Sequence, residues 1–155
     1  MRFLLIDRIT EWHPGTSARA IKNVALSEDF LDDHFPSKPI MPGVLLIEGM
    51  AQLSGILIEE GVRRDEGRNV KALMSIVDKV KFRKPVYPGD SLVYEARVQS
   101  VNELGARAEV KAYCTGELVA ECGLVFSFHV IENPRLEARR AEILAMWLKG
   151  LPDHE

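Results

Sequence analysis

This chain of 155 residues has only two cysteines, no net positive charge and no long apolar run. The two cysteines, Cys114 and Cys122, form no Cys-x-x-Cys pair, which argues against a zinc site or a redox motif. We expect both to be reduced thiols in a cytoplasmic protein. The formal net charge of −3 argues against general nucleic-acid binding, which usually requires a basic surface.

No apolar run is suited to crossing a membrane. The stretch at residues 44–58 is shorter than the roughly 20 residues that a spanning helix needs, and it contains Glu48 and Gln52. The first residues carry no small-residue cleavage site after their apolar segment, so we expect no secretory signal. The sequence therefore predicts one cytoplasmic domain, long enough to bury a substantial core and without stable membrane insertion.

Alternation of apolar and polar residues predicts a mainly antiparallel sheet. We expect strands at residues 3–12, 18–26, 71–81, 92–99, 106–114 and 119–130. Ser27 is expected to cap a short helical turn at residues 28–31, and residues 63–69 are expected to form an exposed loop.

A central helix is expected at residues 43–62, where apolar side chains fall on every face. Such a helix is normally enclosed by its own protein. Gly49 and Gly55 lower its intrinsic helix propensity and are expected to let another backbone approach closely. The pattern therefore predicts a strongly curved sheet with this helix laid along it.

A second helix is expected near the carboxyl end of the chain. Asn133 is a suitable cap, Pro134 suits the first helical position, and Gly150 with Pro152 should end the helix. Its apolar residues form only one stripe, so we expect it to pack outside the sheet.

An imidazole and a carboxylate flank the start of the central helix. His34 lies in a proline-rich loop before the helix, and Glu48 lies within the helix. A His and an acid in apolar surroundings can serve as a general acid/base pair. The alternatives are a loop histidine that only forms hydrogen bonds and an acid paired with Arg or Lys. Gln52, one turn after Glu48, is either a hydrogen-bond partner of the acid or a satisfied core amide.

The same residues resemble a known family signature. The run His34-Phe35-Pro36-x-x-Pro39-Ile40-Met41-Pro42-Gly43-Val44, followed by Glu48 and Ala51-Gln52, resembles that of the β-hydroxyacyl-acyl carrier protein dehydratases of the FabZ type. Residues 78–90 also resemble this family. The resemblance implies an α+β hotdog fold, in which a curved antiparallel sheet wraps a long central helix. We place the hotdog domain at residues 1–132 and an additional helical extension of the same domain at residues 133–155.

The resemblance also implies an activity and an assembly. The family dehydrates (3R)-hydroxyacyl-acyl carrier protein to trans-2-enoyl-acyl carrier protein in fatty acid or related acyl-chain biosynthesis, without a metal or an organic cofactor. It forms homodimers, which can assemble into a trimer of dimers, and its active site joins a histidine from one subunit to an acid from the other. On this chain those residues are His34 and Glu48. A glutamate at the acid position favours the type that dehydrates without isomerising.

Each residue of the motif then has an expected role. His34 is the base, and Glu48 is the acid if burial raises its pKa. The N–H groups of Gly43 and Val44 at the helix start would stabilise the developing negative charge on the thioester oxygen. Glu48 lies about 7 Å further along the helix axis, a spacing suited to the C3 hydroxyl of the same substrate. The remaining substrate-binding residues are expected to be Phe35, Pro42 and Gln52.

Two further points stay open at this level. The cluster Lys81, Arg83 and Lys84 is either a solvated strand end or a docking surface for acyl carrier protein. The alternatives to a dehydratase are a hotdog thioesterase and a non-catalytic hotdog partner subunit of a specialised lipid, polyene or polyketide pathway.

Overall fold

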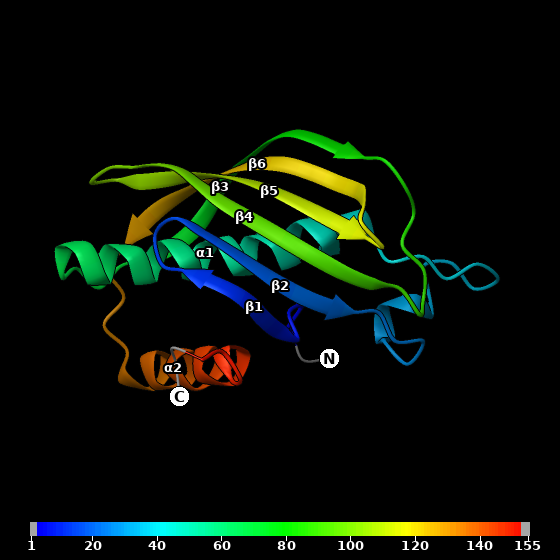
Figure 1. Ribbon diagram of the computed structural model, residues 1–155, viewed down its shortest axis with the longest axis horizontal. Helices are drawn as coiled ribbons and strands as arrows, with labels where there is room; N and C mark the ends of the chain where they lie inside the picture. The colour runs from blue at the N-terminus through cyan, green and yellow to red at the C-terminus, as the bar shows by residue number, and fades with distance from the viewer. Residues whose placement is uncertain (1–2, 153–155) are drawn as a thin grey trace.

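A six-stranded antiparallel sheet curls around the long helix α1 (Gly43–Glu66), as Figure 1 shows. The computed structural model describes residues 3–152. In spatial order the strands are β1 (Arg8–His13), β2 (Ser17–Asn23), β4 (Ser91–Val101), β5 (Gly105–Cys114), β6 (Glu117–His129) and β3 (Lys71–Phe82). This arrangement confirms the predicted α+β hotdog fold. In the described residues, no helix is long and apolar enough to cross a membrane.

The core lies between α1 and the concave face of the sheet. Tyr94 on β4 is fully buried, and the strand register places it beside Ala20 on β2 and Ala112 on β5. Its ring reaches Gly49 on α1, where a Cβ atom would lie 2.7 Å from the ring. One large ring is therefore accommodated by small residues on both neighbouring strands and on the helix, which is how native cores reach their high packing density.

The glycines of α1 have different surroundings from those expected. At Gly49 the close neighbour is the Tyr94 side chain and not a backbone, and at Gly55 a Cβ atom would meet only ordinary contacts, the nearest at 3.6 Å from Phe126. The close backbone approach occurs instead at Gly61. A Cβ atom there would lie 2.6 Å from the amide nitrogen of Gly15, in the turn between β1 and β2.

Three local predictions were wrong. Strand β1 begins at Arg8, because residues 3–7 run beside α1 and the backbone of Leu5 bonds to a helix side chain. The helix continues to Glu66 and ends at Gly67, whose positive φ of 67° allows its N–H to donate to the carbonyl of Arg63. The short 3-10 helix η1 (Asp29–Leu31) follows Glu28 and has no side-chain cap, so Ser27 does not cap it.

The second helix, α2 (Pro134–Leu148), begins as predicted, since the Asn133 side chain accepts hydrogen bonds from two backbone N–H groups of the first turn. It lies outside the sheet, near β1 and on the side of α1 that the sheet leaves open (Figure 1). Trp147 is buried in the core, and Arg140 forms an ion pair with Glu59 of α1. This packing supports one domain, and the division at residues 132/133 stays a prediction.

Strand β3 forms one edge of the sheet and pairs with β6 on its inner side. Its surface carries large apolar side chains that are strongly exposed, which include Leu73, Met74, Ile76, Val77, Val80 and Phe82. Exposed apolar edge strands are pairing sites for another strand. This edge is therefore the part of the sheet best suited to meet a second chain.

The glycine contacts predict opposite effects for two alanine substitutions in α1. Gly61→Ala forces a methyl group into the backbone of the β1–β2 turn and should lower the free energy of unfolding by about 2 kcal/mol. Gly55→Ala is the matched control, because it meets no clash and should raise stability by up to about 1 kcal/mol through helix propensity. Urea unfolding of both variants measures the difference, and equal effects of the two substitutions would contradict this account of the packing.

The ion pair between the helices predicts a pH dependence. Burial raises the pKa of Glu59, an effect that Arg140 and the N–H of Ala72 oppose. The folded state therefore holds the proton more tightly than the unfolded chain, so the contribution of Glu59 to stability falls as the pH rises from about 4.5 through the folded pKa. Relative to the wild type, Glu59→Gln should become more stable over this range. Urea unfolding at a series of pH values tests the slope, and an opposite slope would show that Arg140 dominates.

Candidate active site

His34 is held in a fixed orientation by the loop that leads into α1. Its Nδ1 lies 2.7 Å from the carbonyl oxygen of Ile40, and the N–H of Ile40 donates to the carbonyl of His34. The imidazole also stacks on Phe35, with ring centroids 4.2 Å apart. Because a carbonyl oxygen only accepts, we infer that Nδ1 carries the proton in the neutral ring and that Nε2 is free to accept one.

The loop itself is fastened at both ends. Phe35 and Lys38 exchange two backbone hydrogen bonds across a tight turn, and the N–H of Met41 donates to the carbonyl of Val86 at 2.8 Å. Met41 and Val86 are both buried, so the carboxyl end of the loop is anchored in the core. These contacts place His34 beside the first turn of α1.

His34 shares a cavity of about 370 Å³ with Gly43 and Val44 at the start of α1. Within residues 3–152 the N–H groups of Gly43 and Val44 have no acceptor. The first N–H groups of the helix that form a hydrogen bond are those of Leu45 and Leu46, which both donate to the carbonyl of Pro42. Free N–H groups at a helix start, together with the helix dipole, favour a negatively charged oxygen. The cavity thus combines a proton acceptor with a pair of hydrogen-bond donors.

An aromatic ring that the sequence analysis missed forms part of this cavity. A Cβ atom on Gly43 would lie 2.7 Å from the ring of Phe82, the last residue of β3. Gly43 therefore makes room for Phe82 as well as for any ligand. The residue stands in the segment at 78–90 that resembles the family, and that was the signal available for it.

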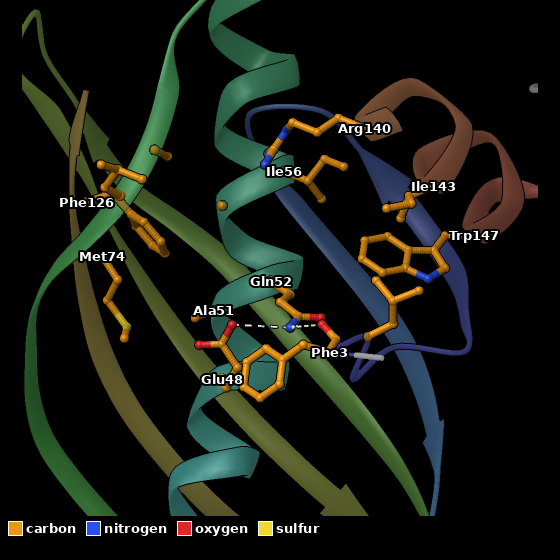
Figure 2. A pocket seen from close by; sticks show the side chains of 14 residues that line it. Phe3, Glu48, Ala51, Gln52, Ile56, Met74, Phe126, Arg140, Ile143 and Trp147 are labelled. Atoms are coloured by element: carbon orange, nitrogen blue, oxygen red, sulfur yellow. Dashed lines mark hydrogen bonds between the residues drawn. The ribbon is translucent and has the colours of Figure 1, made fainter. Parts of the chain in front are cut away.

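Glu48 lines a different cavity of about 400 Å³, which Figure 2 shows. Its Oε1 accepts a hydrogen bond of 3.2 Å from Nε2 of Gln52. Gln52 also donates to the carbonyl of Phe3 at 3.1 Å and accepts from the N–H of Leu5 at 3.0 Å. The amide of Gln52 is therefore satisfied by the backbone and also bound to Glu48, so both alternatives considered for it hold.

Within one chain the structure separates Glu48 from His34 and from the helix start. Glu48 lies five positions after Gly43, which advances the helix by about 7 Å and also turns it by about 140°. From the sequence we considered only the axial distance between the helix start and Glu48; for His34 and Glu48 the family resemblance implied a site shared by two subunits. His34, Gly43 and Val44 line one cavity, and Glu48 and Gln52 line the other.

The other predicted residues surround the histidine cavity in different ways. Arg83 and Lys84 line it, and they pair with Glu121 and Glu117 of β6, respectively. Lys81 lies opposite Glu121 in the pairing of β3 with β6. Phe35 and Pro42 are not among the lining residues: Phe35 supports the imidazole, and Pro42 is the residue that caps α1.

The cavity of Glu48 is also lined by residues that were not expected at a site. Phe3 was expected in a strand, and Ile143 and Trp147 belong to α2, which lies outside the sheet as predicted; all three line this cavity. Among the described residues, no group of three or more His, Cys, Asp or Glu side chains is arranged to hold a metal ion.

Comparison with known proteins places these residues in a family. The family model of the FabA-like domain matches residues 1–123. The chain is 41% identical over 125 residues to the 3-hydroxyacyl-[acyl-carrier-protein] dehydratase FabZ of Caldicellulosiruptor saccharolyticus, covering 81% of this chain and 87% of that protein. The chain belongs to the FabA-like family and, within it, to the FabZ type. This confirms the resemblance carried by the motif at residues 34–52.

Other relatives of this FabZ-type chain agree. FabZ of Sulfurovum sp. is 44% identical over 127 residues, which cover 79% of this chain and 84% of that protein. The bifunctional enzyme LpxC/FabZ of Chlorobaculum tepidum is 46% identical over 123 residues, and this chain spans only 26% of its length.

Solved structures with low sequence identity share the fold. A hypothetical thioesterase from Streptococcus pneumoniae with coenzyme A has a TM-score of 0.64 at 12% identity, covering 81% of this chain and 88% of that one. The dehydratase heterocomplex ApeI:P from Xenorhabdus doucetiae has a TM-score of 0.59 at 18% identity, covering 77% of this chain and 98% of that one.

Proposed function

We propose that this chain is a hydro-lyase that converts (3R)-hydroxyacyl-acyl carrier protein to trans-2-enoyl-acyl carrier protein and water, in fatty acid or related acyl-chain biosynthesis. The observation that carries the proposal is the histidine cavity, where His34 with a free Nε2 lies beside the unpaired N–H groups of Gly43 and Val44. The FabZ relatives, which are named as dehydratases of this kind, support the same reaction.

The arrangement accounts for each bond that changes. Nε2 of His34 takes the C2 proton while the thioester oxygen accepts hydrogen bonds from the start of α1, and one well-placed donor of this kind is worth about 3 kcal/mol. The C2 electron pair then forms the double bond as the C3–O bond breaks. The protonated carboxyl of Glu48 gives its proton to the departing hydroxyl, which leaves as water. Return of the proton from His34 to Glu48, directly or through water, restores the starting state.

We further propose that the site is completed by a second copy of the chain. His34 and Glu48 lie in separate cavities, and β3 presents an apolar edge that can pair with the same edge of a partner. A two-fold axis at this edge repeats each contact, so a dimer holds two sites, each with His34 of one subunit and Glu48 of the other. Further assembly into a trimer of dimers and a cytoplasmic location stay predictions from the sequence.

Removal of either reacting group should abolish turnover. His34→Ala and Glu48→Gln should each lower kcat by about 10³-fold, because each removes one proton-transfer step. The assay follows formation of the enoyl product from a hydroxyacyl carrier-protein thioester, with circular dichroism and urea unfolding to show that the variants fold.

The same assay separates the alternative functions. A thioesterase would release a free thiol, which dehydration does not, and a non-catalytic subunit would give neither product on its own. If either variant keeps a rate near that of the wild type, that residue has no part in the chemistry.

Mixing the two inactive variants tests the shared site. A dimer of one His34→Ala chain and one Glu48→Gln chain has one site with both groups intact and one site with neither. After unfolding and refolding an equal mixture, we expect about a quarter of the wild-type rate to return, since about half of the dimers are mixed. Each variant refolded alone is the control. If no activity returns although mixed dimers form, both groups must come from one chain.

We propose that acyl carrier protein, an acidic partner, docks near Arg83 and Lys84, which rim the histidine cavity. The double variant Arg83→Ala/Lys84→Ala should raise KM for acyl carrier protein substrates about tenfold at low salt and leave KM for pantetheine thioesters unchanged. Lys111→Ala, an exposed lysine on β5, is the matched control. If KM changes equally for both substrate types, or for neither, Arg83 and Lys84 do not dock the carrier protein and serve only in their ion pairs with β6.

A further inference from the structure

Helix α2 borders the cavity that contains Glu48, although the match to the FabA-like family model ends at residue 123, before this helix begins. In Figure 2 the outer face of α1 forms the floor of the cavity, with Ile143 and Trp147 of α2 on one side. Met74 of β3 and Phe126 of β6 lie on the other side. A part of the chain outside the family match thus contributes a wall next to the candidate acid.

The floor of this cavity is a straight path along α1. Glu48, Gln52 and Ile56 are four residues apart and therefore share one helix face, which places Ile56 about 12 Å beyond Glu48. Between them Ala51 and Gly55 keep the floor low, and a Cβ atom added at Gly55 would meet its nearest neighbour only at 3.6 Å. The space above these residues can hold an extended apolar chain.

Among the described residues of the lining, Gln52 and Arg140 already have partners, whereas Nε1 of Trp147 is buried without one. Gln52 uses both of its amide atoms on backbone groups and Glu48. Arg140, at the α2 end of the cavity, is bound to the buried Glu59. The groove between Glu48 and α2 therefore offers apolar contacts to a ligand and no free charge, which suits a hydrocarbon chain.

The wall that α2 supplies is fixed in place. Trp147 is only 4% exposed. Asn69 donates from Nδ2 to the carboxylate of Glu137 at 2.6 Å, and Arg140 is bound to Glu59, so α2 is attached to the body of the protein at three positions. A wall held in this way can set the length of a groove, because moving it would break the buried ion pair and leave a charge without a partner.

We infer that α2 determines acyl-chain length: the distal carbons of the acyl chain lie between Ile56 and Ile143, and α2 sets where the groove ends. This inference rests on the proposed function, since it assigns a place to the chain of the same thioester. Ile143 is the residue to vary, because it is partly buried and lines the cavity, whereas Trp147 is needed by the core.

The test compares a short and a long 3-hydroxyacyl thioester for three variants. Ile143→Phe fills the end of the groove and should lower the ratio of kcat/KM for the long over the short substrate about tenfold, whereas Ile143→Ala should raise it. Ala145→Phe adds the same ring at an exposed position of α2 and should keep the wild-type ratio. Size-exclusion chromatography with light scattering is run on all variants.

The outcomes decide the inference independently of the reaction. If the wild type dehydrates these thioesters but the Ile143 variants keep its ratio, or if Ile143→Phe alone changes the oligomeric state, the inference fails and the dehydratase proposal stands. If the wild type dehydrates none of them, the dehydratase proposal fails. Binding of saturated acyl-pantetheine thioesters, followed by tryptophan fluorescence, then decides: opposite length preferences of the two Ile143 variants support the groove, and equal preferences overturn it.

Discussion

Enclosure of α1 is the constraint on which the rest of the structure depends. The helix carries apolar side chains on nearly all of its faces, so a flat sheet could cover only one side of it. The sheet therefore curls, and the small residues at positions 20, 49 and 112 let it close on the helix around the ring of Tyr94. What the sheet leaves open is covered in part by α2 and by the segment at residues 3–7. The open remainder is where Glu48 lies.

The same geometry explains why the candidate site is divided. The start of α1 emerges at one end of the curled sheet, where the loop of His34 closes over it, while Glu48 faces the open side of the helix. Within one chain the two groups line separate cavities, because Glu48 is turned by about 140° around the helix axis from Gly43. The composite site that we propose with a second copy at β3 would bring the two groups together, and it would give the exposed apolar edge of β3 a function.

Features determined by residues close together in the sequence could be predicted, and features that depend on contacts between distant residues could not. The periodicity of α1, the strands and the Asn133 cap are local, and the motif at residues 34–52 identified the family. The pairing of Arg140 with Glu59 joins residues 81 positions apart, and nothing near either residue indicates it. The rotation of Glu48 away from Gly43 was derivable from helix geometry alone, and it was missed because only the rise along the axis was considered.

The three hydrogen bonds of Gln52 give the amino-terminal segment a place in the site. One side-chain amide binds the backbone of Phe3 and Leu5 and the carboxylate of Glu48. The segment at residues 3–5 therefore helps to hold the acid in position. A fusion partner or affinity tag joined to the amino terminus would therefore be attached next to the hydrogen bonds that hold Glu48 in position.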